Sequence, residues 1–333
     1  MKLQILIPQY NETDDVVKPL LDSIAIQQNV DLGQIGVIIC NGGSQTFLSE
    51  EFLASYPFKI EYHKATEHES VSATRNACLD KATAEYVMFC DADDMFANVF
   101  GLWIIFREID NGGFDSLVSV FYEETINPQT KQKEFIHRGD PNTTGVDGTF
   151  VHGKVHNLNY LKAKEIRWNN DLTIHEDSYF NILCQKLSKN VKFCPTPFYL
   201  WKWRDDSVCR RDNKYILKTL PNMLQSNTAL VEQFISRGMI AEAQSYATSM
   251  IMDTYYSMNC KQWLEAENAE YRNILEKCFK EYYTKFEHLF KAINEQEKNQ
   301  IIYGIRNRFF MEGLMIESIT FDDWIKHITT EVE

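Results

Sequence analysis

The sequence lacks any apolar run of about 18 residues, the length that a transmembrane helix needs. Its N-terminal apolar stretch is too short for the hydrophobic region of a secretory signal, and no small-residue cleavage site follows it. We therefore expect no transmembrane segment and interpret this stretch as a first buried strand. The eight cysteines form no C-x-x-C pair, which argues against a disulfide framework and favours a cytoplasmic location.

The chain also lacks an excess of positive charge. Its formal net charge is -13 over 333 residues, which argues against binding to nucleic acid through a broad basic face, although a local basic groove stays open. Internal repeats and low-complexity tracts are missing as well. What is present is the composition of a globular protein with 13% aromatic residues, enough to build a sizeable core.

Apolar runs alternate with helical patterns over the first two thirds of the chain. Strands are predicted at residues 3–8, 35–40, 58–65, 86–90 and 115–122, and helices at 16–27, 70–83 and 178–190. This alternation predicts βαβ units and a mostly parallel sheet. Residues 124–150 are polar and predict a long loop or hairpin, and 191–203 predict a strand with a turn or edge at its two prolines.

After about residue 215 the apolar residues recur at spacings of three and four, with almost no alternation of the β type. We predict an α/β catalytic domain at residues 1–215 and a helical domain at residues 216–333. The helical region could pack on the first domain, bind an acceptor or mediate homo-oligomers.

Polar sequences follow three of the predicted strands: "QYNETDD", "NGGS" and "DADD". Ligands of open α/β sheets bind at the carboxyl ends of the strands. Asp91 and Asp93 of the last loop have the spacing and the oxygen chemistry that suit Mg²⁺ or Mn²⁺, but solvated loop acids would give the same pattern. An EF-hand is disfavoured because its glycine would fall at Phe96, and an aspartyl-phosphate enzyme is disfavoured by Met95.

Two further patterns could carry charge chemistry. Arg75, on the helix predicted before the acids, could pair with a diphosphate or an Asp group, or form a structural ion pair. Glu176 and Asp177 precede another helical run, where acids are common for dipole reasons. A carboxylate kept ionised there could also accept a proton from a hydroxyl.

The later part of the α/β region holds a cationic patch of Arg204, Arg210 and Arg211, which could close over phosphates. It also holds three histidines, His152, His156 and His175. They lack the glutamate of the metalloprotease arrangement, so we favour acceptor contacts or structural roles over a zinc site. One of them could complete a metal shell.

Taken together, these elements resemble the family 2 glycosyltransferases, which have the GT-A fold, a Rossmann-like α/β architecture with a mostly parallel central sheet. The matching pieces come in the family's order and are "ILIPQYNE", "VIICNGGS", "SVSATRNACLDKATAEYVMFCDADD", "IHED" and "YLWKWRDDSVCR". They cover roughly residues 1–210, and the block from Ser70 to Asp94 is the most specific.

The resemblance implies a nucleotide-sugar donor, with UDP as the default nucleotide. Pro8, Tyr10 and Glu12 match the first loop, which cradles the base and ribose, and Tyr10 could stack on the base. Arg75 matches the arginine that follows the base and phosphate region. Arg204 and Ser207 match the late segment that closes on the diphosphate and acceptor.

The resemblance also implies roles for the acids. Asp91 matches the acid that usually meets the ribose and lies beside the metal, and Asp93 matches the acid that binds Mn²⁺ or Mg²⁺. Asp94 would support either one. Asp177 matches the catalytic base, with Glu176 beside it, so the implied reaction is a single displacement that inverts the sugar.

One departure concerns the second loop, where the family usually has "DDGS" and this chain has "NGGS", so that Asn41 and Gly42 stand in for the acids. An amide both donates and accepts, so it could still bind a base, with a different hydrogen-bonding pattern from that of a carboxylate. Two alternatives stay open: a nucleotidyltransferase, and a non-catalytic binding or scaffold protein of the same fold. The acceptor could be a glycan, another polymer, a lipid-linked sugar, a protein or a modified nucleic acid base.

Overall fold

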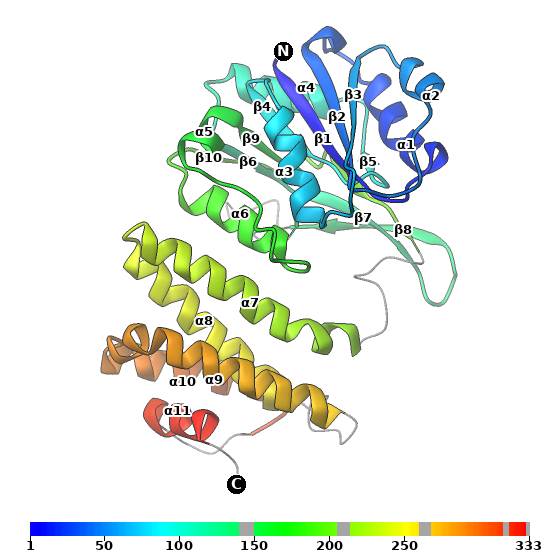
Figure 1. Cartoon of the computed structure of the whole chain (residues 1–333). Coiled ribbons are helices and arrows are strands. Elements are labelled where there is room, and N and C mark those ends of the chain that lie inside the picture. Colours follow the sequence, from blue (N-terminus) through cyan, green and yellow to red (C-terminus); the bar gives the residue numbers. More distant parts are fainter. Residues whose placement is uncertain (140–149, 205–213, 260–267, 316–319, 331–333) are drawn as a thin grey trace. The chain divides into compact units, whose positions relative to one another are not determined.

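The structure is a computed structural model that describes residues 1–139, 150–204, 214–259, 268–315 and 320–330 (Figure 1). The chain divides into two compact units, residues 1–208 and residues 209–333. The first unit is α/β and the second is helical.

A seven-stranded sheet forms the centre of the first unit, in the order β10-β6-β9-β4-β1-β2-β3. The strands are β1 (Leu3–Gln9), β2 (Ile35–Asn41), β3 (Lys59–Lys64), β4 (Tyr86–Phe89), β6 (Ser116–Ser119), β9 (Lys154–Asn157) and β10 (Val191–Cys194). Of these, β9 runs antiparallel to its neighbours, β4 and β6. This mostly parallel sheet confirms the predicted fold class.

The register of the parallel strands decides where the polar loops lie. β1 and β2 are near-continuous apolar runs buried on both faces, as central parallel strands require. Gln9 at the end of β1 pairs with Asn41 at the end of β2, and Leu6 pairs with Phe89 at the end of β4. The loops that follow these three strands therefore start at one edge of the sheet.

Helices cover the sheet of the first unit and close its core. They are α1 (Asp14–Ala25), the 3-10 helix η1 (Leu32–Gln34), α2 (Glu50–Ala54), α3 (Val71–Lys81), α4 (Gly101–Asp110), α5 (Leu158–Ala163) and α6 (Glu176–Lys186). α3 packs against β1 and β2 (Figure 1). Its first turn is capped by Ser70, whose side chain accepts a hydrogen bond from the Ala73 backbone N–H.

A second sheet has the order β5-β11-β7-β8. Its strands are β5 (Met95–Phe96), β7 (Phe121–Ile126), β8 (Lys133–Arg138) and β11 (Tyr199–Trp201). The prediction of one strand at 115–122 is wrong, because the run divides at Val120 into β6 and β7, which lie in different sheets. The run 191–203 divides at its prolines into β10 and β11, and 124–138 forms part of the β7–β8 hairpin, both as predicted.

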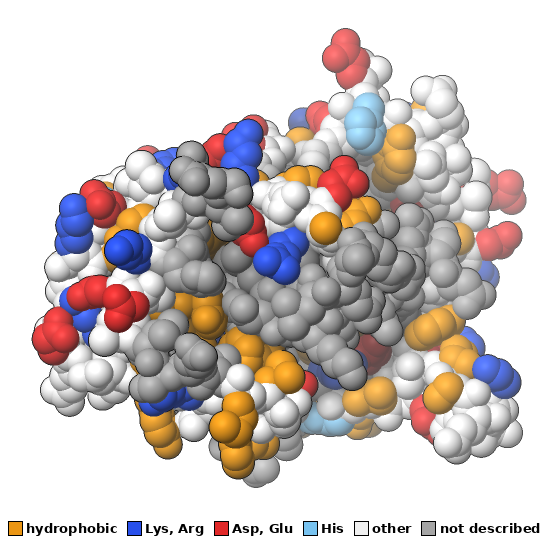
Figure 2. Space-filling view, turned by 90° about the horizontal axis from the view of Figure 1, so that it is seen from below, with side chains coloured by type: hydrophobic (Ala, Val, Ile, Leu, Met, Phe, Trp, Pro, Cys, Tyr) orange, Lys and Arg blue, Asp and Glu red, His pale blue; other side chains and the backbone are white. Residues whose placement is uncertain are grey.

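The second unit consists of α7 (Lys214–Ser236), α8 (Ile240–Asn259), α9 (Ala269–Lys291), α10 (Glu295–Met311) and α11 (Phe321–Thr329). Its core includes Phe234, Phe279, Phe286 and Trp324. The predicted helical region is therefore confirmed. No helix among the described residues has both the length and the apolar character needed to cross a bilayer. Figure 2 shows hydrophobic side chains between charged ones on one face of the molecule.

Candidate active site

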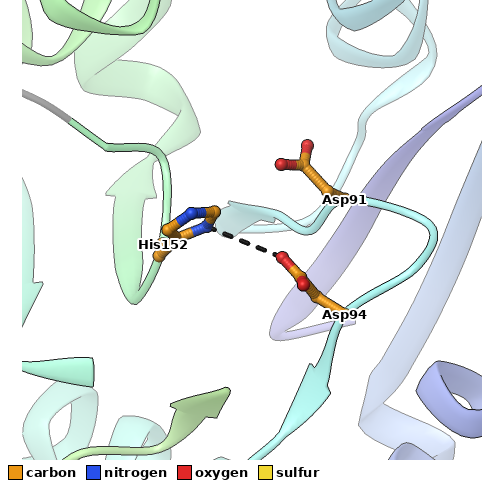
Figure 3. Close-up of side chains that lie close together, drawn as sticks. All are labelled: Asp91, Asp94 and His152. Carbon is orange, nitrogen blue, oxygen red and sulfur yellow. Dashed lines mark ion pairs between the residues drawn. The ribbon is translucent and has the colours of Figure 1, made fainter. Parts of the chain in front are cut away.

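The "DADD" loop begins directly after β4 and Cys90 and turns back at once, because the Asp94 backbone N–H donates to the Asp91 carbonyl at 3.1 Å. The turn places the side chains of Asp91 and Asp94 on the same side of the loop, facing His152 (Figure 3). The loop then enters β5, so both of its ends are held by strands.

Arg75 connects this loop with α6. Its Nη2 donates to Asp91 Oδ1 at 2.9 Å, and its Nη1 donates to Glu176 Oε1 at 2.9 Å. The guanidinium also lies 4.5 Å from the centre of the Trp168 ring. Only 5% of the Arg75 side chain is exposed. The sequence prediction that Arg75 pairs with an Asp group is met.

Asp94 is almost fully buried and holds the end of β11 against the loop. Its Oδ2 accepts from the Tyr199 hydroxyl at 2.6 Å, and its Oδ1 accepts from the Lys202 backbone N–H at 2.9 Å. The Tyr199 hydroxyl in turn accepts from the Asp91 backbone N–H at 3.2 Å. Asp94 thus stabilises the loop through hydrogen bonds to Tyr199 of β11 and to Lys202.

A group of three potential metal ligands lies at this point. Single atoms of Asp91, Asp94 and His152 all come within 4.8 Å of one another, and His152 Nδ1 lies 3.7 Å from Asp94 Oδ2 (Figure 3). The His152 ring is held in place by stacking on Tyr199, with ring centres 4.9 Å apart. Two carboxylates and an imidazole form a donor set that fits a divalent cation such as Mn²⁺.

Asp93, the acid predicted to bind the metal, lies outside that group of three. Its Oδ2 accepts from Arg204 Nη1 at 3.0 Å, and the same Arg204 nitrogen lies 3.9 Å from Glu12 Oε1. Arg204 therefore lies beside acids of the first and third loops. Ser207, Arg210 and Arg211 lie outside the described residues.

The other two histidines have different surroundings. His156 is buried in β9, where its Nδ1 is 2.9 Å from Ser116 Oγ, and burial lowers its pKa to about 3. It is a neutral core residue, which agrees with the structural role we favoured. His175 precedes α6 with φ of 63°, a left-handed conformation that starts the helix abruptly.

The first loop presents Tyr10 to solvent and folds over Glu12. The Tyr10 side chain is 47% exposed, and its ring lies edge-on to His68 with ring centres 5.0 Å apart. Glu12 Oε2 accepts from the Tyr10 backbone N–H at 2.6 Å. Pro8 lies within β1 and pairs in register with Cys40. About half of the Tyr10 side chain is thus accessible to solvent.

The Asn41 side chain makes most of its hydrogen bonds to residues of its own loop. Its Oδ1 accepts from the backbone N–H groups of Gly43 and Ser44 at 2.9 and 2.8 Å. Its Nδ2 donates to the Thr46 carbonyl at 2.9 Å and lies 3.0 Å from Ser44 Oγ. The residue is 1% exposed. The geometry assigns this amide to shaping the loop, and these bonds compete with the base contact that the sequence suggested.

The carboxylates of Asp91, Asp93 and Asp94 lie close together, and their mutual repulsion affects their pKa values. Burial and the charges of the neighbouring acids raise the pKa of Asp93 and raise that of Asp94 further. Burial alone would raise the pKa of Asp91, but Arg75 and His152 lower it below its usual value. Asp91 is therefore the acid of this loop that stays ionised most readily.

Asp177 lies in the first turn of α6 beside Glu176. Burial and the charge of Glu176 raise its pKa to about 8, against the opposing effect of Arg75. The expectation that the helix N-terminus keeps this carboxyl ionised is therefore not met at neutral pH. A carboxyl with this pKa is well matched to taking up a proton near pH 8.

Comparison with known proteins agrees with this architecture. The sequence pattern described as glycosyl transferase family 2 matches residues 4–199. The chain therefore belongs to glycosyl transferase family 2, and it is a glycosyltransferase.

Two relatives and one solved structure show how far the likeness extends. EpsH of Bacillus subtilis strain 168, which carries a provisional glycosyltransferase name, is 20% identical over 69% of each chain. The poly(ribitol-phosphate) beta-glucosyltransferase of Bacillus spizizenii is 25% identical over 57% of this chain and 30% of its own. The structure of S. aureus TarS 1-349 with UDP-GlcNAc has a TM-score of 0.66 at 14% identity, over 95% of this chain and 93% of that one.

Proposed function

We propose that this chain transfers a sugar from a nucleoside diphosphate-sugar, with UDP as the expected nucleotide, to a hydroxyl group of an acceptor. One observation carries the proposal. Through its two terminal nitrogens, Arg75 joins Asp91, which follows β4, to Glu176, which begins α6 beside Asp177, and so links the proposed donor side to the helix of the proposed base. The UDP-GlcNAc complex of the structural neighbour supports the choice of donor.

On the donor side, the exposed ring of Tyr10 offers a stacking surface for the base. Asp91 is the ionised acid nearest the β4 end and is assigned to the ribose. Arg204 is assigned to the diphosphate, whose departing charge its guanidinium would stabilise. A divalent cation held by Asp91 and Asp93, or by Asp91, Asp94 and His152, would supply further neutralisation of that charge.

On the acceptor side, Asp177 takes the proton of the attacking hydroxyl. With a pKa near 8 the carboxyl binds this proton firmly once it is transferred. Attack from the side opposite the diphosphate inverts the anomeric configuration and needs no covalent sugar intermediate.

The test uses UDP-GlcNAc and Mn²⁺ with the full chain, and it measures donor hydrolysis and UDP binding. We expect Asp177→Asn to abolish turnover while UDP binds as tightly as to the wild type. Equal turnover in the variant would refute the base assignment. Binding without any turnover in the wild type would instead favour the non-catalytic alternative.

A further inference from the structure

Arg75 lies in the second turn of α3, on a helix that is itself fixed on β1 and β2. Its neighbour Asn76 anchors the segment that carries Trp168: Asn76 Nδ2 donates to the Trp168 carbonyl at 2.9 Å, and Asn76 Oδ1 accepts from the Trp168 N–H at 3.1 Å. Trp168 stacks on Phe180 of α6, with ring centres 4.2 Å apart. The guanidinium is thus held between rigid parts of the fold.

The two partners of Arg75 come from different sides of the proposed reaction. Asp91 belongs to the donor loop, and Glu176 is the first residue of the helix that carries Asp177. Each partner takes one guanidinium nitrogen at 2.9 Å. Such paired, buried contacts fix direction as well as distance.

We propose that Arg75 is a positioning residue that joins the donor-side acid Asp91 to Glu176 and thereby sets the place of Asp177 relative to the donor. The inference rests on the proposed function and assigns Arg75 a different task from the base and phosphate contact that the family resemblance implied. With 5% of its side chain exposed and both carboxylates bound, Arg75 offers little surface to a diphosphate.

The same bridge affects the charge of the base. The charged groups that act on Asp177 are Glu176, which raises its pKa, and Arg75 and Lys154, which lower it. His175 precedes this pair along the chain, and burial lowers its pKa, so it is neutral at pH 7. Removing Arg75 and removing the charge of Glu176 should therefore shift the pKa of Asp177 in opposite directions.

The experiment compares Arg75→Lys, Arg75→Gln and Glu176→Gln in the full chain, with UDP-GlcNAc and Mn²⁺ as the probe. We expect UDP affinity to stay within about threefold of the wild type, because Arg75 itself is not assigned to the donor and the Asp91 backbone stays held by the Tyr199 hydroxyl. We expect kcat for donor hydrolysis to fall about 100-fold in both Arg75 variants, the scale of a small misplacement of reacting groups. The Lys variant keeps the charge but cannot span both carboxylates.

The pH dependence of kcat/KM separates positioning from general support of the fold. Its acidic limb should move to higher pH in Arg75→Gln and to lower pH in Glu176→Gln. If Arg75→Gln does not fold, Arg75→Lys decides through its expected fall in kcat at unchanged UDP affinity, because it keeps the charge and loses only the bridge to both carboxylates. A limb that moves in the same direction in both variants, or stays in place in Glu176→Gln, would overturn the inference.

Two other results would show that Arg75 binds the donor, or that the proposed function is wrong. If the Arg75 variants weaken UDP binding tenfold or more and turn over bound donor normally, Arg75 is a donor ligand and the inference is wrong. If the wild type neither binds UDP nor hydrolyses UDP-GlcNAc, the proposed function itself fails, and the inference fails with it.

Discussion

Substitution of Asn41 by aspartate restores the acid that the family usually has in the second loop, and it tests whether this position reads a base or holds a turn. In the structure, Asn41 Oδ1 accepts two backbone hydrogen bonds and Nδ2 donates to the Thr46 carbonyl at 2.9 Å. An ionised aspartate keeps the two accepted bonds but replaces the donor by a second oxygen. That oxygen would face the Thr46 carbonyl.

The expected loss of folding stability depends on the hydrogen-bond donors around the new side chain. Ser44 Oγ and Gln9 Nε2 already donate to the Thr46 carbonyl at 3.0 and 3.3 Å, so this carbonyl keeps donors in the variant. The new carboxylate oxygen instead faces a carbonyl oxygen and can gain a donor only by drawing a hydroxyl from its present partner, and a lost hydrogen bond in this buried loop costs about 1–3 kcal/mol. We expect a loss of about 2 kcal/mol at pH 7, or roughly 4–8 °C in the melting temperature of a unit of this size.

The sign of the pH dependence is fixed by the same geometry. When it is protonated, the introduced carboxyl can donate to the Thr46 carbonyl as the amide does, so the fold favours the protonated form and raises the pKa of the new acid. The destabilisation should therefore be small near pH 4 and grow as the pH rises through the folded-state pKa. Thermal or urea unfolding of the full Asn41→Asp chain at about pH 4.5 and pH 7 measures it.

Asn157→Asp is the matched control. Asn157 caps α5 by accepting the Tyr160 backbone N–H at 2.9 Å, a task that aspartate performs equally well. We expect its stability to change by less than about 0.5 kcal/mol. If Asn41→Asp is as stable as this control and binds UDP more tightly than the wild type, the residue reads the base and our account of the loop is refuted.

The remaining predictions concern charge and backbone. The fold raises the pKa of Asp177 from 3.8 to about 8, so the contribution of its protonated carboxyl to stability is present at pH 3 and is lost as the pH rises towards 8. The stability of Asp177→Asn relative to the wild type, measured by urea unfolding, should therefore increase over that range. A constant difference would contradict this. Arg204→Gln removes the cation that pairs with Asp93, a predicted metal ligand. Calorimetry should therefore show that Mn²⁺ binds up to about fivefold tighter, whereas Mn²⁺ binding to the Arg167→Gln variant should be unchanged. Gly43→Ala places a Cβ against the Glu67 carbonyl oxygen, well inside contact distance, at a φ of +83°, whereas Gly112→Ala meets open space at a φ of +95°. The melting temperature should therefore fall further in Gly43→Ala than in Gly112→Ala. Equal losses in the two variants would be contrary to our reasoning.

The edge of the sheet at which the site lies could be predicted from the sequence alone. Buried parallel strands read as continuous apolar runs, and each run here ends in a polar loop, so the order of runs and loops was sufficient. The helix that carries Arg75 was also predictable, since Ser70 is a strong capping residue at its start. These features depend on local chemistry, which the sequence contains.

Contacts between distant segments could not be predicted in the same way. An apolar run such as 115–122 carries no mark of the point where the chain passes from one sheet to another, and the break falls at Val120 without a proline or glycine. The place of His152 beside Asp94 likewise depends on how β9 and β11 pack, and the two histidines of "VHGKVH" look alike in sequence. One of them is a buried core residue and the other faces the acids.

The electrostatics of the site indicate that this edge is adapted to bind something cationic or to move a proton rather than to add stability. Burial raises the pKa of Glu12, Asp93, Asp94 and Asp177, so in all four the fold disfavours the charged form. A sequence selected for stability alone would replace such acids by amides or apolar residues, because each ionised carboxyl opposes folding at neutral pH. Perturbed acids of this kind gather where chemistry needs them. The crowding of carboxylates around two arginines, the buried Arg75 and Arg204, is therefore the physical feature that most clearly separates this edge from ordinary loop acids.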